Sequence, residues 1–323
     1  MKLERKNQII CNNIVIIDGF SRSGKSMVAR MLGYLDRCEQ WQTEILYEFI
    51  AQMDGLNKIS RDASETIINM WADTHIYNLM IGRNVNSRKT DLSSPYFDGL
   101  ERKFIERLLK PDGDVVLDEI KSINPILPLH VHNILGFSDL LIKGFGTKLK
   151  LYILNLRNPF ELIELYIDWT KRLCIDPRSF KFCIKNDKNE YFPYYIPETH
   201  QGMYKKASNI EKSIITVYCF HKEMFKMADS LDDCFKDKLM FIPFEDFIVN
   251  PDKYIDDICI KLETKRVQDF SKMMKSENLP RDYDMNKYYT LQDFLKKYKN
   301  KNISKKYVDM LTELKVMYKN FIK

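Results

Sequence analysis

The feature that most constrains the fold is the segment from Gly19 to Ser26, which reads Gly-Phe-Ser-Arg-Ser-Gly-Lys-Ser. It fits the pattern G-x-x-x-x-G-K-[ST]. A continuous apolar run at residues 13–18 precedes it, and apolar side chains with helical spacing follow it from Ser26 to Leu35. In such a segment the turn and the start of the next helix direct backbone N–H groups at an anion. The sequence therefore predicts a phosphate-binding loop between a buried strand and a helix.

Three residues of this loop have distinct expected roles. Gly24 lacks a Cβ atom, which would hold an anion away from the backbone. Lys25 can place its charge on terminal phosphoryl or sulfuryl oxygens, and Ser26 can bind the same group or a metal ion. The loop predicts a nucleotide-binding protein, and the rest of the chain has to indicate which nucleotide.

Strand-like and helix-like segments alternate along the chain. Three further buried strands are expected at Asp114–Leu117, Leu149–Leu156 and Leu239–Phe244. The expected helices between and after them are Ala63–Met80, Gly99–Leu109, Pro159–Lys171, Asn209–Ser230 and Pro251–Lys261. This alternation predicts a three-layer α/β fold like that of P-loop NTPases, with a central parallel sheet between helices and a helical C-terminal part. We expect a single domain over residues 1–323, with insertions at about 45–110 and 172–210.

Composition restricts the classes of partner. Lys and Arg exceed Asp and Glu by only 51 to 45, which suits a small anionic ligand better than nucleic acid. The seven cysteines form no CxxC pair and predict free thiols in a reducing compartment, with a Cys174–Cys183 disulfide as the less favoured alternative. A charged N-terminus and the lack of a long apolar run predict a cytoplasmic protein without a membrane span. The oligomeric state stays open.

The run Val115–Leu117 followed by Asp118 and Glu119 has two interpretations. An apolar strand that ends in Asp-Glu is typical of a Walker B segment, in which Asp118 would hold magnesium through water and Glu119 would orient a nucleophile. Alternatively, both are polar residues where a strand leaves the core. The first interpretation favours an ATP- and magnesium-dependent kinase or NTPase that uses Lys25, Ser26 and Asp118.

Four segments, in order along the chain, resemble the family of sulfotransferases that use 3′-phosphoadenosine 5′-phosphosulfate (PAPS). They are Arg22-Ser23-Gly24, like the family's R-S-G loop; Lys121-Ser122-Ile123-Asn124, like K-[ST]-P-x-N; Leu151–Pro159, like the strand that ends in R-[DN]-P; and Ile242–Phe247 with Asn250-Pro251, like Y-E-D-L…[DN]-P. The sequence departs from the family in having Lys25-Ser26 after R-S-G and Leu165 in place of a serine. Leu165 is expected to face the core, and Arg281 is an isolated candidate for the basic residue near the C-terminus.

The resemblance implies PAPS as the donor, an unidentified acceptor hydroxyl, and no magnesium. The implied donor-binding residues are Arg22, Ser23, Gly24, Lys25 and Ser26 for the 5′-phosphosulfate and Arg157 for the 3′-phosphate. The implied catalytic residues are Lys25, Lys121 and the base Glu44, with Glu48 one helical turn further on and His75 in reserve.

Elementary chemistry agrees with a second anion site. Arg157 at a strand end and Pro159 at the first turn of a helix would place a guanidinium beside a helix N-terminus, although a salt bridge at a sheet edge is an alternative. His130 and His132 have no carboxylate nearby in sequence and are expected to be ordinary structural histidines. Sulfuryl transfer from PAPS is thus the leading hypothesis, the kinase or NTPase is the alternative, and a nucleotide-binding protein without turnover is the third.

Overall fold

The computed structural model describes residues 2–6, 9–111, 113–172, 176–177, 181–283 and 289–322. The chain forms two compact units. Unit 1 contains Met1–Leu156 and Leu231–Tyr283, and unit 2 contains Arg157–Ser230 and Asp284–Lys323. The prediction of a single domain with insertions stays a prediction, and each unit is described by itself.

Unit 1 is built on a five-stranded sheet in the order β2-β3-β1-β4-β7, in which every pairing is parallel. Its strands are β1 (Asn13–Gly19), β2 (Gln42–Thr43), β3 (Ile126–His130), β4 (Leu149–Leu156) and β7 (Leu239–Pro243). All residues of β1 and β3 are buried, as in strands covered on both faces. The predicted central parallel sheet is confirmed.

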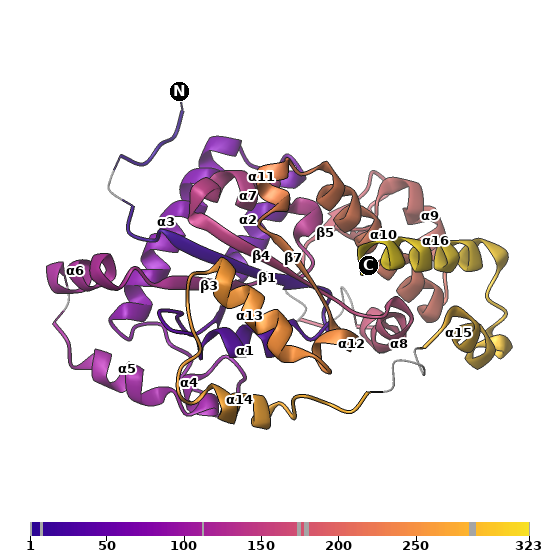
Figure 1. Ribbon diagram of the computed structural model, residues 1–323. Coiled ribbons are helices and arrows are strands. Elements are labelled where there is room, and N and C mark those ends of the chain that lie inside the picture. The colour runs from indigo at the N-terminus through magenta and orange to yellow at the C-terminus, as the bar shows by residue number, and fades with distance from the viewer. Residues whose placement is uncertain are drawn as a thin grey trace. The chain divides into compact units, whose positions relative to one another are not determined.

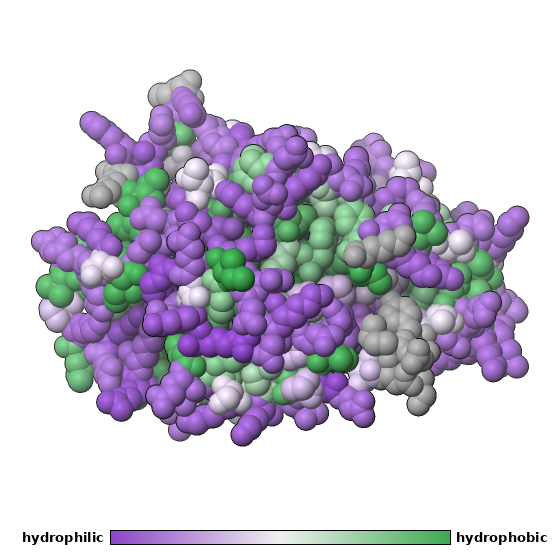
Figure 2. All heavy atoms as spheres, in the orientation of Figure 1, coloured by the Kyte–Doolittle hydropathy of each residue, from purple (hydrophilic) through white to green (hydrophobic). Residues whose placement is uncertain are grey.

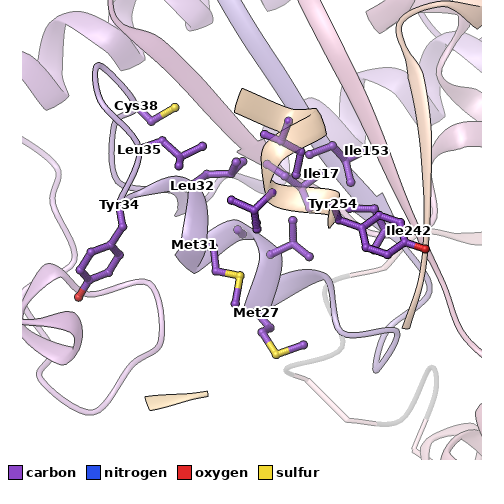
Figure 3. Close-up of a cluster of buried hydrophobic side chains, with 14 of the residues drawn as sticks. Ile17, Met27, Met31, Leu32, Tyr34, Leu35, Cys38, Ile153, Ile242 and Tyr254 are labelled. Carbon is purple, nitrogen blue, oxygen red and sulfur yellow. The ribbon is translucent and has the colours of Figure 1, made fainter. Parts of the chain in front are cut away.

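Helices cover both faces of this sheet (Figure 1). One face carries α1 (Lys25–Leu32), α13 (Pro251–Lys261) and α14 (Phe270–Ser276), and the other carries α2 (Ile45–Gly55), α3 (Arg61–Met80) and α7 (Asp139–Phe145). Val15 and Ile17 of β1 lie in the apolar cluster with α1 and α13, part of which Figure 3 shows. The alternate residues Ile14 and Ile16 are equally buried and point to the other face, as strand geometry requires.

The remaining helices of unit 1 lie in the segments that connect its strands and larger helices. They are α4 (Pro95–Asp98), α5 (Glu101–Leu108), α6 (Asp114–Ile123), η1 (Leu135–Phe137), η2 (Gly146–Lys148), α11 (Asp233–Lys236) and α12 (Phe244–Phe247). The predicted strand Asp114–Leu117 is wrong, because these residues begin α6. Val116 and Ile120 are buried while Val115 is 54% exposed, which is the pattern of an amphipathic helix.

Unit 2 is mainly helical. Its helices are α8 (Pro159–Thr170), α9 (Glu198–Lys206), α10 (Asn209–Ser230), α15 (Leu291–Lys297), η4 (Lys299–Lys301) and α16 (Lys305–Phe321), and β5 (Cys183–Lys185) pairs antiparallel with β6 (Tyr191–Pro193). The long helix α10 packs on α8 and α16. The expectation that Leu165 faces the core is wrong, because this side chain is 46% exposed.

Polar side chains cover most of the face shown in Figure 2, with apolar residues in scattered patches. Within the described ranges, no helix has both the length and the apolar character that crossing a bilayer would require. Cys183 is a free thiol, and Cys174 lies outside the described residues, so the alternative of a disulfide between them is not tested.

Candidate functional site

The predicted phosphate loop connects β1 to α1, as the motif requires. Lys25 is the first residue of α1 and only 3% of its surface is exposed. The backbone N–H groups in the first turn of a helix have no partner within the helix, so they are available to an anion. Arg22 adopts a left-handed backbone (φ 74°) and is exposed, which gives the loop its tight turn and leaves a guanidinium on its outer side.

The structure explains why residue 24 is a glycine in a way that the motif alone does not. Its φ of 91° lies in the left-handed region, and a Cβ atom built there would lie 2.5 Å from Cδ2 of Phe244. Phe244 begins α12, in the segment that resembles the sulfotransferase pattern around Ile242–Phe247. The glycine therefore lets the loop pack directly on an aromatic ring, in addition to its expected role of admitting an anion.

The structure brings His130 and His132, which the sequence predicts to be ordinary structural histidines, to the phosphate loop. His130 ends β3, next to β1, and its Nε2 lies 3.2 Å from Oγ of Ser26. The ring of His132 meets that of His130 edge to face, with 4.9 Å between the centroids. Nδ1 of His132 lies 2.7 Å from Oε1 of Glu48, which is buried on α2. A connected series of side chains thus runs from the phosphate loop to a histidine–carboxylate pair.

His130 is held in its neutral form. Burial lowers its pKa well below the ordinary value, and the positive charge of Lys25 and the neighbouring His132 lower it further. Its ring also contacts that of Trp41, with 4.6 Å between the centroids. Nδ1 of His130 and Oγ of Ser23 are both buried and have no hydrogen-bond partner in the part of the chain that the structure describes. Polar atoms left unsatisfied beside a phosphate loop indicate a ligand or ordered water there.

The proposed base Glu44 lies in a different environment. It precedes α2, and its carboxylate accepts a hydrogen bond from Nε1 of Trp71 at 3.2 Å. Burial raises its pKa. Together with His75 and Arg83 it lines a small cavity of about 10 Å³. Glu44 and the reserve candidate His75 are thus neighbours of each other, and the role of Glu44 as a base stays a prediction.

Lys121 and Asp118 lie on α6 and are paired with each other at 3.4 Å, with more than half of each side chain exposed. Because α6 leads into the start of β3, it lies at the amino-terminal edge of the parallel sheet, whereas the phosphate loop follows the carboxyl end of β1 (Figure 1). The structure therefore does not bring Lys121 to the loop. The Walker B interpretation of Asp118 is wrong for the same reason, so the kinase alternative keeps Lys25 and Ser26 but loses its expected magnesium ligand.

The other two arginines that the sequence singled out have protein partners. Arg157 follows β4 as the first residue of unit 2, and its guanidinium pairs with Glu161 on α8 at 2.9 Å. Its expected contact with a 3′-phosphate stays a prediction. Arg281 donates to the carbonyl of Glu277 at 3.1 Å and lies beside Met27 of α1.

No family model and no curated protein matches this sequence. Several solved structures are similar at low identity. A sulfotransferase domain from the curacin biosynthetic pathway is 12% identical with a TM-score of 0.45, covering 94% of this chain and 97% of that one. The sulfotransferase domain of the olefin synthase of Synechococcus PCC 7002 is 14% identical with a TM-score of 0.43, covering 98% of each chain. Sulfotransferase STF9 of Mycobacterium avium is 10% identical with a TM-score of 0.40, over 91% of this chain and 77% of that one. At these values we draw no functional conclusion from them.

Proposed function

We propose that this protein is a sulfotransferase that binds PAPS at residues 19–26 and transfers its sulfuryl group to an acceptor hydroxyl. The observation that carries the proposal is the pair of Glu48 and His132, connected to the phosphate loop through His130 and Ser26. It combines an anion-binding loop with a group able to remove a proton from an acceptor, and these are the two requirements of the reaction.

The loop residues fit the sulfated end of PAPS. The group would be held by the backbone of Gly24 and by Lys25, Ser26 and the unsatisfied hydroxyl of Ser23. When bound, PAPS supplies the sulfuryl group and departs as adenosine 3′,5′-bisphosphate. Lys25 is almost fully buried, so its charge acts in a poorly hydrated environment, where it stabilises negative charge that develops on the leaving oxygen.

His132 would be the general base. When Nδ1–H donates to Glu48, the lone pair of the neutral imidazole is on Nε2, which is the atom that accepts a proton from the acceptor hydroxyl. The carboxylate of Glu48 fixes this tautomer and stabilises the imidazolium that forms. Ser26 donates its hydroxyl proton to the anion in this scheme, so it accepts a hydrogen bond from Nε2–H of neutral His130. His130 would therefore orient Ser26.

Binding of adenosine 3′,5′-bisphosphate and of ATP, each measured by calorimetry with and without magnesium, tests the donor. We expect tight binding of the bisphosphate that does not depend on magnesium. ATP binding that requires magnesium, with no preference for a 3′-phosphate, would contradict the proposal.

The His132→Gln variant tests the base. With ³⁵S-labelled PAPS and a panel of a phenol, a primary alcohol and a sugar, we expect kcat to fall by roughly 10²–10⁴ because general base catalysis is lost. Affinity for adenosine 3′,5′-bisphosphate should stay within about twofold, since the loop is unchanged. His200→Gln in unit 2 is the matched control and should retain wild-type kcat. If instead Glu44→Gln abolished transfer and His132→Gln did not, Glu44 would be the base.

A further inference from the structure

Asp18, the residue before the phosphate loop, is a completely buried carboxylate with four donors around it. Its Oδ1 accepts from the backbone N–H of Gly19 at 2.7 Å. Its Oδ2 accepts from the N–H groups of Leu135 at 2.8 Å and Ile134 at 3.1 Å, and from the hydroxyl of Tyr152 on β4 at 2.9 Å. Oδ1 therefore holds the start of the phosphate loop, with a longer 3.4 Å contact from the N–H of Ile134, and Oδ2 holds the chain that follows β3.

The chain that follows β3 carries the histidines. Residues 130–135 run from His130 through His132 to the two amides that Asp18 binds. Asn133 adds a second tie, because its N–H donates to the carbonyl of Gly19 at 3.2 Å. The loop that would hold the donor and the segment that would hold the base are thus fixed to each other at Asp18 and Gly19.

The chemistry of the contact requires a carboxylate. All four partners are donors, so both oxygens must act as acceptors, which only the ionised form provides in full. Burial raises the pKa of Asp18, whereas the bonds from Gly19 and Tyr152 and the charge of Lys25 oppose that rise. A buried carboxylate is costly unless its hydrogen bonds are complete, so its presence here indicates a position that has to be held accurately.

We propose that Asp18 is a positioning residue, which sets the distance and orientation of His132 relative to the nucleotide bound in the loop. The proposal rests on the function proposed above. Asp18 itself contacts neither donor nor acceptor in this scheme. It acts through Gly19 on one side and through the backbone of residues 134–135 on the other.

The isosteric variant Asp18→Asn tests this role, because the asparagine amide has one acceptor and one donor group. If its oxygen faces Leu135, its NH₂ group faces the N–H of Gly19, and the reverse orientation breaks the other side. Either orientation breaks the connection through the side chain of residue 18 and leaves the hydrogen bond from Asn133 to Gly19 as the remaining tie between the loop and the histidine segment. We expect kcat to fall at least tenfold, while affinity for adenosine 3′,5′-bisphosphate changes less than threefold.

A double-mutant cycle separates positioning from general destabilisation. In the His132→Gln background, Asp18→Asn should lower the remaining transfer rate less than twofold, because the group that Asp18 positions is already absent. Tyr152→Phe is the matched control, since it removes one donor to Asp18 and leaves both ties intact, and its kcat should stay within about twofold of wild type. An equal loss of kcat in both backgrounds, or equal losses in the Asn and Phe variants, would overturn the proposal.

A measurement that does not depend on turnover tests the positioning role of Asp18 separately from the proposed sulfotransferase function. In wild-type protein, adenosine 3′,5′-bisphosphate should shift the side-chain NMR signals of His132, and Asp18→Asn should reduce that shift to less than half. Binding with an undiminished shift would refute the role of Asp18 and leave the sulfotransferase proposal standing, whereas wild type that does not bind the bisphosphate would refute the proposed function. If Asp18→Asn does not fold, slower amide exchange at Ile134 and Leu135 on binding of the bisphosphate to wild type supports the tie, and unchanged exchange contradicts it.

Discussion

Individual residues of the phosphate loop depend on neighbours that lie far away in sequence. Gly24 packs against the ring of Phe244, and Gly19 is so close to Asn155 that a Cβ atom would lie 2.5 Å from its carbonyl oxygen. The motif therefore specifies two glycines for two reasons, an unusual backbone conformation and a close contact. The contact with Phe244 makes the loop sensitive to substitutions on α12 as well as to its own.

We expect Gly24→Ala to lower the free energy of unfolding by about 2–4 kcal/mol. The new methyl group would strain a backbone in the left-handed region, and it would also overlap with the ring of Phe244. Gly99→Ala is the control: its φ of 71° is similar, but nothing lies within 4 Å of the added Cβ atom. That variant should lose only about 1 kcal/mol from the backbone term. Urea unfolding of both variants checks the difference.

The contact itself can be tested by adding Phe244→Leu to Gly24→Ala. The smaller side chain should recover part of the lost stability, since it relieves the clash and leaves the backbone strain in place. No recovery would mean that the conformation of Gly24, and not its packing on Phe244, accounts for the loss.

At the scale of elements, α5 is fastened to the edge of the sheet by a buried ion pair. Arg107 of α5 donates from Nη1 to Oε2 of Glu39 at 2.6 Å and from Nη2 to Oε1 at 2.8 Å, and Lys103 adds a third contact at 3.0 Å. Burial alone would raise the pKa of Glu39, but Lys103 and Arg107 outweigh it and lower the pKa to about 2. Few apolar residues of α5 are buried, so this pair determines where the helix docks.

Glu39→Gln should destabilise the protein by about 3–5 kcal/mol, because it leaves the guanidinium of Arg107 buried without a counter-ion. Arg102→Ala, which breaks the exposed pair with Glu106 on the same helix, should cost less than about 1 kcal/mol. Chemical denaturation at pH 7 measures both. Similar losses in the two variants would show that the buried pair does not hold α5.

The buried pair of Glu39 and Arg107 also predicts how the stability of the protein depends on pH. Because the pKa of Glu39 is lower in the folded than in the unfolded state, its stabilising effect is present above an ordinary carboxyl pKa of 4.5 and is lost as the pH falls towards 2. The difference in unfolding free energy between wild type and Glu39→Gln should therefore shrink by about 3 kcal/mol across that window. A constant difference from pH 5 to pH 2.5 would contradict the assignment.

The elements that sequence predicts best are the buried strands with continuous apolar runs. The bounds of β4 match the prediction, and β1 differs by one residue. The strand β3, which lies beside β1 on the side away from β4, is not predicted from the sequence, for two reasons. A four-residue apolar run such as residues 114–117 fits one face of a helix as well as a strand. The real strand, β3, contains Pro128, which argues against a central strand.

Pro128 is tolerated because of where its backbone points. Ile126, two residues earlier and therefore on the same side, exchanges hydrogen bonds with residues 37–39. The missing N–H of Pro128 thus faces the β2 side of the strand, where β2 pairs only with Leu129 and His130. Local propensity could not reveal that Pro128 is tolerated, because its tolerance depends on which neighbouring strand each backbone group faces.

The candidate site was predicted where it is local and missed where it depends on tertiary contacts. Strand, loop and helix are contiguous, so residues 19–26 could be identified from the pattern alone. The pair of Glu48 and His132 joins residues 84 positions apart. No carboxylate is near His130 and His132 in sequence, so the sequence alone predicts structural histidines. The position of both histidines at the carboxyl end of a strand next to β1 would have indicated that they lie near the phosphate loop. That inference requires a correct prediction of β3.

At the scale of the whole molecule, the phosphate loop, both histidines and Asp18 all belong to unit 1, while Arg157 begins unit 2. The two predicted parts of the donor site are therefore supported by different kinds of observation. The loop is supported by buried, unsatisfied polar atoms of its own unit. The proposed role of Arg157 comes from the sequence pattern and is tested by a separate measurement.

Amide hydrogen exchange with two nucleotides supplies that measurement. Adenosine 3′,5′-bisphosphate at 100 times its dissociation constant should stabilise the folded state by about 2.7 kcal/mol and slow exchange in residues 17–35 and 130–135. Adenosine 5′-phosphate at equal saturation is the control, since it lacks the 3′-phosphate. If Arg157 binds that group, residues 157–162 at the start of α8 should be protected by the bisphosphate and not by the monophosphate. If neither nucleotide protects them, Arg157 acts only through its ion pair with Glu161, and the 3′-phosphate is held elsewhere. Protection of residues 17–35 by both nucleotides would still support the loop, so the two halves of the donor site are decided separately.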